Sequence, residues 1–380
     1  MNTSVSRLEM YYRCSYQHFA QYGLGLKERR TYKLDAPDIG QLFHEALKTI
    51  TDWINKEGRD FSDVTEKEAN QYAQKAITHL APILQNEILR SSNRYKYIEK
   101  KLLEVITRAT YILSEQARRS GFTPVGLELA FGKGETLNPV RIQLPNGYEL
   151  LLRGRIDRVD KGIFGNELYL RIIDYKSSNT DLNLIDVYYG LALQMLTYLD
   201  VVLTQSEAWL GKKGQPAGML YFHVHNAMLS EETRISDEKI NHQLFKKYKM
   251  NGLLLSNKDI VQLMDSDLES GSSSIIPAGF KNDGQFNAYS KIADYDTFSN
   301  LQTYIHYLIQ QAGVDMTSGM LRLNPYEFKQ KSACTFCSFK SLCQFDPILE
   351  ENRFRKLTNM KEKDILNKIK EEAERGSKHW

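Results

Sequence analysis

The first 119 residues alternate hydrophobic and polar positions with the period of a helix. Apolar side chains recur at steps of three and four residues, which places them on one face of each predicted helix. Asp38 stands where a helix N-cap is expected, Pro82 would kink a helix, and Ser120-Gly121 would end one. The segments predicted to be helical are 4–22, 39–56, 65–89 and 95–119.

The period changes to that of β-strands after residue 125. From Val125 to Tyr175 hydrophobic and polar residues alternate, and glycine-rich turn signals interrupt them after residues 131 and 144. A helix is predicted over 186–203 and another strand over 218–225. The order of helices, strands, helix and strand predicts an α+β fold with an N-terminal helical layer.

The remaining chain is less periodic and suggests several regions. Residues 270–283 carry Gly-Ser-Ser-Ser and Pro-Ala-Gly turn signals, which indicate an insertion or mobile loop, and the last twenty residues are strongly charged. The expected regions are an N-terminal segment (1–35), a core (36–225) that includes the helical region 57–119, an insertion with connecting helices (226–325), a cysteine segment (326–360) and a charged, solvated helix or tail (361–380).

Composition excludes some classes of protein. The chain has 380 residues, 42% of them hydrophobic, and a net charge of +3 from 50 basic and 47 acidic residues, which alone does not indicate nucleic-acid binding. We find neither an apolar signal region nor a run of about 18 apolar residues, so we expect a cytoplasmic protein without a membrane span. No G-x-x-x-x-G-K-[ST] loop is present, so we expect no ATP-driven motor in this chain.

Two acidic residues and a lysine carry the most specific chemical signal. Asp157 and Asp174 are each the first charge after a β-favouring run, so each is expected at the end of one strand of a hairpin. Alternation along the strand puts Asp174 and Lys176 on one face and Tyr175 on the other. Converging carboxylates repel unless a cation lies between them, and oxygen ligands favour Mg²⁺ or Mn²⁺. The pattern therefore indicates a metal-dependent phosphodiester hydrolase, against the alternative of a surface ion pair.

Other residues would supply the remaining parts of such a site. His44 lies on a predicted helix and is a possible metal ligand or a core histidine. Glu128, in a predicted strand, would complete the carboxylate set or orient a water, unless it is only a strand-edge acid. Gln194 and Tyr198 share a helix face and would hold a phosphate or base, or form a surface pair.

The four cysteines form a split metal-binding pattern. Cys14 lies near one end, and Cys334, Cys337 and Cys343 form C-x2-C-x5-C near the other. In a cytoplasmic chain this spacing favours metal ligation over disulfides. A [4Fe-4S] cluster and tetrahedral zinc both fit four thiolates, and four buried free thiols are the alternative.

Taken in order, these motifs resemble the RecB-type PD-(D/E)XK nucleases over most of the chain. The opening Ser4-Val-Ser-Arg-Leu-Glu9, with Tyr11-Tyr-Arg-Cys14, is similar to the C-terminal nuclease domain of the AddB (RexB) subunits of bacterial helicase-nucleases. Ser15 follows Cys14 where that family is expected to have proline. The other matching motifs are Gly40-x3-His44, Arg155-Ile-Asp157, Asp174-Tyr-Lys176 and Gln194-x3-Tyr198.

The resemblance implies a fold and a role for each of these residues. It implies a restriction-endonuclease-like mixed β-sheet flanked by helices, with a C-terminal cysteine-cluster segment. By resemblance, His44, Asp157, Asp174 and the carbonyl of Tyr175 bind the divalent metal, and Lys176 is catalytic. Gln194 and Tyr198 match a motif near the DNA. The four cysteines are assigned to a [4Fe-4S] cluster with a structural and DNA-end-binding role.

The implied activity is a Mg²⁺- or Mn²⁺-dependent DNA nuclease that cuts single strands unwound by a helicase during resection of double-strand breaks. An AddA-type helicase-nuclease subunit and single-stranded DNA ends are the implied partners. Such domains follow a helicase-like region, so we expect an excised domain or a truncated product. The alternatives are a stand-alone CRISPR-associated iron-sulfur exonuclease, against which the long helical region 57–119 argues, and a non-catalytic DNA-end-binding iron-sulfur module.

Overall fold

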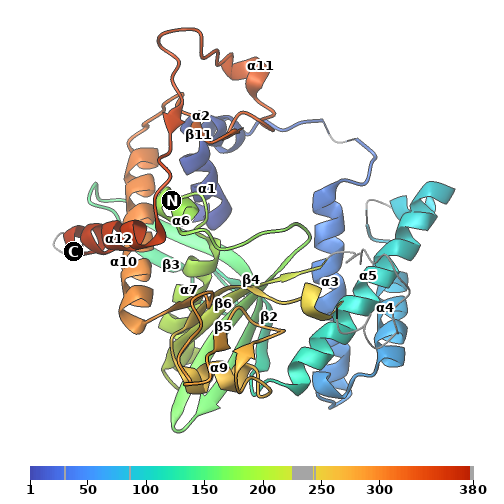
Figure 1. The fold of residues 1–380 in the computed structure, drawn as a ribbon. Helices are drawn as coiled ribbons and strands as arrows, with labels where there is room; N and C mark the ends of the chain where they lie inside the picture. The colour runs from blue at the N-terminus through green and yellow to red at the C-terminus, as the bar shows by residue number, and fades with distance from the viewer. Residues whose placement is uncertain (30, 85–86, 225–242, 244, 377–380) are drawn as a thin grey trace.

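A mixed sheet of eight strands forms the centre of the computed structural model, which describes all residues except 30, 85–86, 225–242, 244 and 377–380. Neighbouring strands follow the order β1-β4-β5-β6-β7-β10, and β2 and β3 also pair with β4. Parallel and antiparallel pairs alternate along this order, and helices flank the sheet (Figure 1), which confirms the expected mixed fold. The strands are β1 (Asn2–Ser4), β2 (Thr123–Phe131), β3 (Val140–Gln143), β4 (Glu149–Phe164), β5 (Glu167–Lys176), β6 (Gly214–His223), β7 (Asn251–Leu255) and β10 (Ile292–Ala293).

The β4–β5 hairpin is longer than the sequence predicts. Strand β4 has 16 residues, so Asp157 lies in its middle and not at its end. The strand continues because the charges that follow are neutralised inside the protein. Asp160 accepts hydrogen bonds from Arg158 (Nε to Oδ1, 2.6 Å) and from Arg171 of β5 (Nη2 to Oδ2, 2.9 Å). All three side chains of this Arg158–Asp160–Arg171 triad are buried, in a part of the strand where hydrophobic side chains would be expected.

Helices α3 (Ala36–Lys56), α4 (Glu66–Leu80) and α5 (Asn93–Arg118) form the expected N-terminal layer beside the sheet (Figure 1). Helix α3 begins earlier than predicted, with Asp35 as its N-cap. Asp38 is the third residue after this N-cap and completes a capping box, because its Oδ2 accepts the Asp35 N–H at 2.9 Å. Helix α4 ends at Leu80, before Pro82, so the predicted kink is a helix end.

The single helix predicted over 186–203 is two helices, α6 (Leu184–Tyr188) and α7 (Gln194–Leu210). Gly190 separates them with φ of +75°, a left-handed conformation, and a Cβ there would lie 2.4 Å from the Tyr12 ring. Helix α7 packs on β5 and β6. The separation matters because α7 then begins at Gln194, at the edge of the site described below.

The C-terminal helix is packed and not merely solvated, contrary to the prediction for residues 361–380. Helix α12 (Glu362–Gly376) lies against α10 (Tyr295–Thr317) and α6, and it buries Ile365 and Ile369. Of the predicted insertion (226–325), residues 226–242 and 244 lie outside the described residues, while β7 and β10 extend the main sheet. No helix among the described residues has the length and apolarity needed to cross a membrane.

The N-terminal segment is broken where the sequence predicts one helix over 4–22. Helix α1 (Val5–Arg13) ends at Cys14, whose φ of −165° is extended, and a short α2 (Ser15–His18) and a π-helical turn (Phe19–Gly23) follow. The remaining elements are two 3-10 turns (Phe61–Asp63 and Ile88–Arg90), α9 (Lys258–Met264), β8 (Gly271–Ser272), β9 (Gly279–Phe280), β11 (Tyr326–Phe328), β12 (Lys331–Ser332), α11 (Lys340–Cys343) and β13 (Arg355–Lys356).

The buried triad predicts a large loss of stability when Asp160 is changed. The substitution Asp160→Asn leaves two buried guanidinium groups without their anion, which should lower the free energy of unfolding by about 3–5 kcal/mol. Glu104→Gln, which breaks the surface pair with Lys101, is the matched control and should leave the urea midpoint nearly unchanged. Equal losses of unfolding free energy in Asp160→Asn and Glu104→Gln would contradict the role of Asp160 as the buried anion of the triad.

The same triad predicts how the effect depends on pH. Burial opposes the charged form of Asp160, but the two guanidinium groups outweigh burial and lower the pKa of its carboxyl. Because the folded pKa lies below the unfolded value of about 4, the stabilisation is present above pH 4 and is lost as pH falls through the folded pKa. The difference in unfolding free energy between the parent and Asp160→Asn should therefore stay constant from about pH 5 to 8 and shrink only in stronger acid.

Candidate functional site

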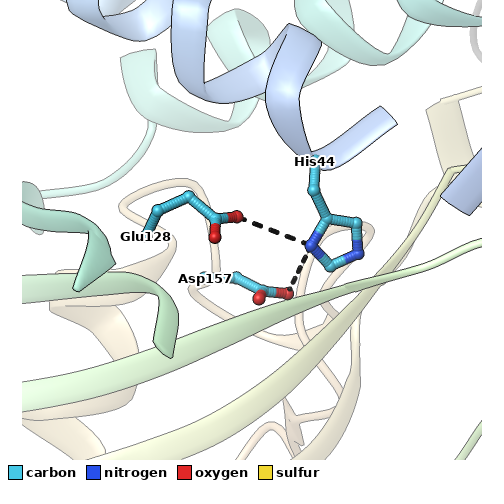
Figure 2. Close-up of side chains that lie close together, drawn as sticks. All are labelled: His44, Glu128 and Asp157. Carbon is cyan, nitrogen blue, oxygen red and sulfur yellow. Dashed lines mark ion pairs between the residues drawn. The ribbon is translucent and has the colours of Figure 1, made fainter. Parts of the chain in front are cut away.

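Three side chains from three elements converge where α3 crosses the sheet (Figure 2). His44 of α3 places its Nδ1 3.3 Å from Oδ2 of Asp157 on β4 and 3.6 Å from Oε1 of Glu128 on β2. Among the described residues, no other group of three or more His, Cys, Asp or Glu side chains brings its ligand atoms within 4.8 Å of one another. The predicted convergence of His44 and Asp157 is therefore present, and Glu128 joins it.

The second half of the site lies on β5 and α7. Nζ of Lys176 is 2.6 Å from Oδ2 of Asp174, so the two side chains share a face of β5 as the alternation predicts. Gln194 bridges them, because its Nε2 donates to Oδ1 of Asp174 at 2.9 Å and its Oε1 accepts from Nζ of Lys176 at 3.4 Å. The N–H of Tyr175 donates to Oδ2 of Asp157 at 2.8 Å and joins the two halves.

The charges in this site are strongly coupled. Burial alone would lower the pKa of His44, but hydrogen bonds and charge from Asp157 and Glu128 raise it to about 10. Burial and then the charge of Asp157 raise the pKa of Asp174 to about 7, against the opposing effects of Lys176 and His44. Three acids thus face one imidazole and one amine, and the Arg155 guanidinium lies 3.8 Å from Glu128 as a further, more exposed cation.

The hydrogen bonding of two carboxylate oxygens in the site shows whether a cation would fit there. Oε1 of Glu128 and Oδ2 of Asp174 are buried and make no hydrogen bond, although His44 forms an ion pair with the former and Lys176 with the latter. A buried carboxylate oxygen without a hydrogen bond is costly, and a hard cation would remove that cost. The donor set of carboxylate oxygens and one imidazole therefore fits Mg²⁺ or Mn²⁺.

Glu128 has an unusual backbone. Its neighbours Leu127 and Leu129 pair with Arg158 and Ile156, so Glu128 stands opposite Asp157 in the β2–β4 register. Its φ is +47°, in the left-handed region that costs a non-glycine residue about 1–2 kcal/mol. Strain of this kind persists where the surroundings hold it, and it is concentrated at functional sites.

The predicted DNA-contacting residues are placed deeper than a surface contact requires. Gln194 is engaged with Asp174 and Lys176, and the Tyr198 side chain is buried with its ring 5.8 Å from that of Phe131. Burial, and then the charge of Asp174, raise the pKa of Tyr198. The geometry gives Gln194 the role of orienting Asp174 and Lys176; contact of either residue with DNA stays a prediction.

Glu9 is a site residue that sequence reasoning missed. Helix α7 follows Leu193, which offers no capping side chain, and Oε1 of Glu9 accepts the N–H groups of Leu193 (2.8 Å) and Gln194 (3.1 Å) instead. Burial raises the pKa of Glu9, while these two bonds lower it. The available signal was a helix without a polar N-cap, together with an acid in the opening motif. Glu9 thereby holds the residue that orients Asp174.

The four cysteines line one cavity of about 280 Å³, bounded mainly by residues of the C-terminal segment and α2. The structure thus brings Cys14 to the other three, although no three thiols among them lie within 4.8 Å of one another. Burial raises the pKa of Cys14, and burial with the neighbouring thiols raises that of Cys334 to about 11. Thiolates in this place therefore require a positive partner, and a cluster or metal ion supplies one.

The strained conformation of Glu128 predicts an inverted preference between glycine and alanine. In an ordinary strand alanine is more stable than glycine by about 0.5–1 kcal/mol, but at φ of +47° glycine carries no strain. Glu128→Gly should therefore have a higher free energy of unfolding than Glu128→Ala by about 1 kcal/mol. Urea unfolding of the metal-free proteins measures it.

The matched control for this comparison is Ile163, which is 63% exposed on the neighbouring strand β4. There Ile163→Ala should be more stable than Ile163→Gly. The same order at both positions would show that the Glu128 backbone is not strained.

The chain is similar to one region of several longer proteins. It is 62% identical over 375 residues to the AddB subunit of the ATP-dependent helicase/deoxyribonuclease of Oceanobacillus iheyensis, and 51% identical to the corresponding subunits of Bacillus cereus and Bacillus anthracis. The matches cover 97–98% of this chain and 32% of each relative. The chain thus spans about a third of the length of these curated relatives, and the expected resemblance is confirmed for that part.

The profile of the PD-(D/E)XK nuclease superfamily matches residues 2–344. The matched range contains every acid, the lysine and the histidine of the site, and all four cysteines. Together with the mixed sheet and the carboxylates on its central hairpin, this match shows that the chain belongs to the PD-(D/E)XK nuclease superfamily.

Proposed function

We propose that this chain is a divalent-metal-dependent deoxyribonuclease domain of the AddB type that hydrolyses phosphodiester bonds in single-stranded DNA. The observation that carries the proposal is the convergence of His44, Glu128 and Asp157 on the sheet of a PD-(D/E)XK chain. The Asp174–Lys176 pair lies beside them on β5, where the N–H of Tyr175 bonds Asp157. The relatives' name, helicase/deoxyribonuclease, supports DNA as the substrate.

His44, Asp157 and Asp174, with Glu128, would hold Mg²⁺ or Mn²⁺, and the backbone carbonyl of Tyr175 is a further candidate ligand. Such an ion neutralises charge on the scissile phosphate and acidifies a bound water. Glu128, held in its strained conformation, is suited to orient an attacking water because its Oε1 has only the longer ion pair with His44, at 3.6 Å, and no close hydrogen bond. Its place opposite Asp157 keeps it within reach of the same phosphate.

Lys176 would stabilise the negative charge that develops during hydrolysis and orient the attacking water. Its ammonium is held between Asp174 and Gln194, so its position is fixed before the substrate arrives. Gln194 also fixes the orientation of Asp174, and Glu9 holds Gln194 at the start of α7. These contacts preorganise the acid and the amine together.

For the cysteines we propose a [4Fe-4S] cluster held by Cys14, Cys334, Cys337 and Cys343. The shared cavity and the charge that thiolates would need there support a metal centre, and the family resemblance favours iron-sulfur over zinc. The cluster would join α1 to the C-terminal segment, across more than 300 positions of sequence, and serve structure and DNA-end binding. A closure of this length restricts the unfolded chain strongly.

We infer that the whole protein works in the cytoplasm with an AddA-type helicase-nuclease subunit, in resection of double-strand breaks for recombination. The length and names of the relatives support this assignment, because the matched third belongs to a subunit of a helicase/deoxyribonuclease. In that setting the domain would receive a strand already unwound.

The central test is cleavage of end-labelled single- and double-stranded DNA with Mg²⁺, with Mn²⁺ and with EDTA. We expect cleavage that depends on the ion, and Asp174→Asn and Lys176→Gln should each lower its rate by about 10²–10⁴-fold. The matched control is Asp315→Asn, which changes an acid that bonds Tyr11 away from the site.

Cleavage that survives Asp174→Asn would show that the assigned site is wrong. If the parent protein binds DNA ends but never cleaves, the non-catalytic DNA-end module replaces the nuclease. Anaerobic purification before these assays keeps loss of the cluster from being mistaken for either result.

The cluster proposal predicts a brown protein with about four iron atoms and four inorganic sulfides per chain. Cys337→Ser should abolish the visible absorption and lower the melting temperature, because the C-terminal segment loses its link to α1. A colourless protein holding one zinc per chain, or a Cys337→Ser variant with unchanged iron content, would contradict the proposal.

A further inference from the structure

A second feature of β4 lies beside the candidate metal site. Arg153, Arg155 and Asp157 occupy every second position of the strand, so they stand in one row on the same face of the sheet. The rise of about 3.3 Å per residue places successive members of the row roughly 6.6 Å apart. Both arginines are exposed, while Asp157 is buried beneath α3. The row therefore runs from the protein surface into the site.

The strands on either side of this row present small side chains. Ser4 of β1 is the register partner of Arg153, and Ala130 of β2 is the partner of Arg155. Because these neighbouring side chains are small, they leave space beside the two arginines, which line a cavity of about 370 Å³. Lys133, in the turn after β2, lines the same cavity.

The cavity favours an anion and adjoins the acids of the site through Arg155. Its charged lining is Arg153, Arg155 and Lys133 against a single acid, Glu135. Arg155 also links the cavity to the site, because its Nη1 lies 3.8 Å from Oε2 of Glu128. That distance is too long for a hydrogen bond, and the Arg155 side chain remains 58% exposed. A ligand held by Arg155 in the cavity would therefore lie next to Glu128 of the metal site.

We propose that this cavity binds the phosphodiester backbone of single-stranded DNA, with Arg153 and Lys133 holding the phosphates that adjoin the one being cut. The proposal rests on the proposed nuclease function and adds the path of the substrate. A single row of cations follows one sugar-phosphate backbone, whereas a duplex presents two backbones across a groove. Arginine suits the task because its planar guanidinium pairs with phosphate in a bidentate manner.

The test measures binding and cleavage separately. Binding of fluorescein-labelled oligo(dT) is titrated by anisotropy in EDTA at several salt concentrations, for the parent protein and for Arg153→Ala, Lys133→Ala and the double variant. Each lost phosphate contact should weaken binding and lower the slope of log K against log salt by about 0.7, so the double variant should lose about 1.4. With Mg²⁺ present, KM for the same strand should rise in the same order.

Two variants serve as controls. Arg375→Ala removes another exposed arginine from α12, outside the cavity, and should keep the parent's salt slope and KM. Arg153→Lys keeps the charge and should retain most of the slope that Arg153→Ala loses. Unchanged melting temperatures identify the variants as folded, which surface positions of this kind lead us to expect.

The outcomes separate the two proposals. If the parent cleaves DNA but Arg153→Ala and Lys133→Ala keep its salt slope and KM, the cavity is not the path and the nuclease assignment stands. If the parent does not cleave but the salt slope falls as described, the cavity binds single-stranded DNA and the nuclease assignment fails. An equal loss of slope in Arg375→Ala would show only general attraction of a cationic surface and would also overturn the proposed path.

Discussion

The central constraint on this site is the repulsion between three largely buried carboxylates. Glu128, Asp157 and Asp174 meet where β2, β4 and β5 lie side by side, and the protein surrounds them with few compensating charges. Helix α3 brings one imidazole, and β5 brings one amine. Even with these cations and Arg155, one buried oxygen of Glu128 and one of Asp174 make no hydrogen bond, and carboxylate oxygens are the ligands that a hard divalent cation prefers.

The scaffold behind the acids must be rigid for that balance to hold. Asp160 and its two arginines keep the hairpin continuous past Asp157, and the N–H of Tyr175 fixes one of the acids. A buried ionic group of this kind contributes to a unique register more than to net stability. The strain at Glu128 is consistent with this view, since only a stiff neighbourhood maintains an unfavourable backbone.

Sequence reasoning found the parts of the fold that local patterns determine. The hairpin, the helical layer and the order of the motifs follow from periodicity and turn residues, and the structure brings His44 to Asp157 as expected. Patterns could not show that charged residues continue β4, because their neutralisation comes from Arg171 on the next strand. Nor could they show that Glu9 caps α7, since the two are more than 180 residues apart in sequence. Both errors concern contacts between different elements, which the hydrophobic pattern within one element does not reveal.

Helix α1 joins two centres that differ in chemistry. Glu9 near its middle holds the start of α7 at the acids, and Cys14 at its end lines the cysteine cavity, about a turn and a half farther along. A rigid helix of nine residues transmits displacement with little loss. The start of α7 beside Asp174 and the wall of the cysteine cavity therefore share one support, so the placement of Cys14 and that of the Glu9 carboxylate are set together.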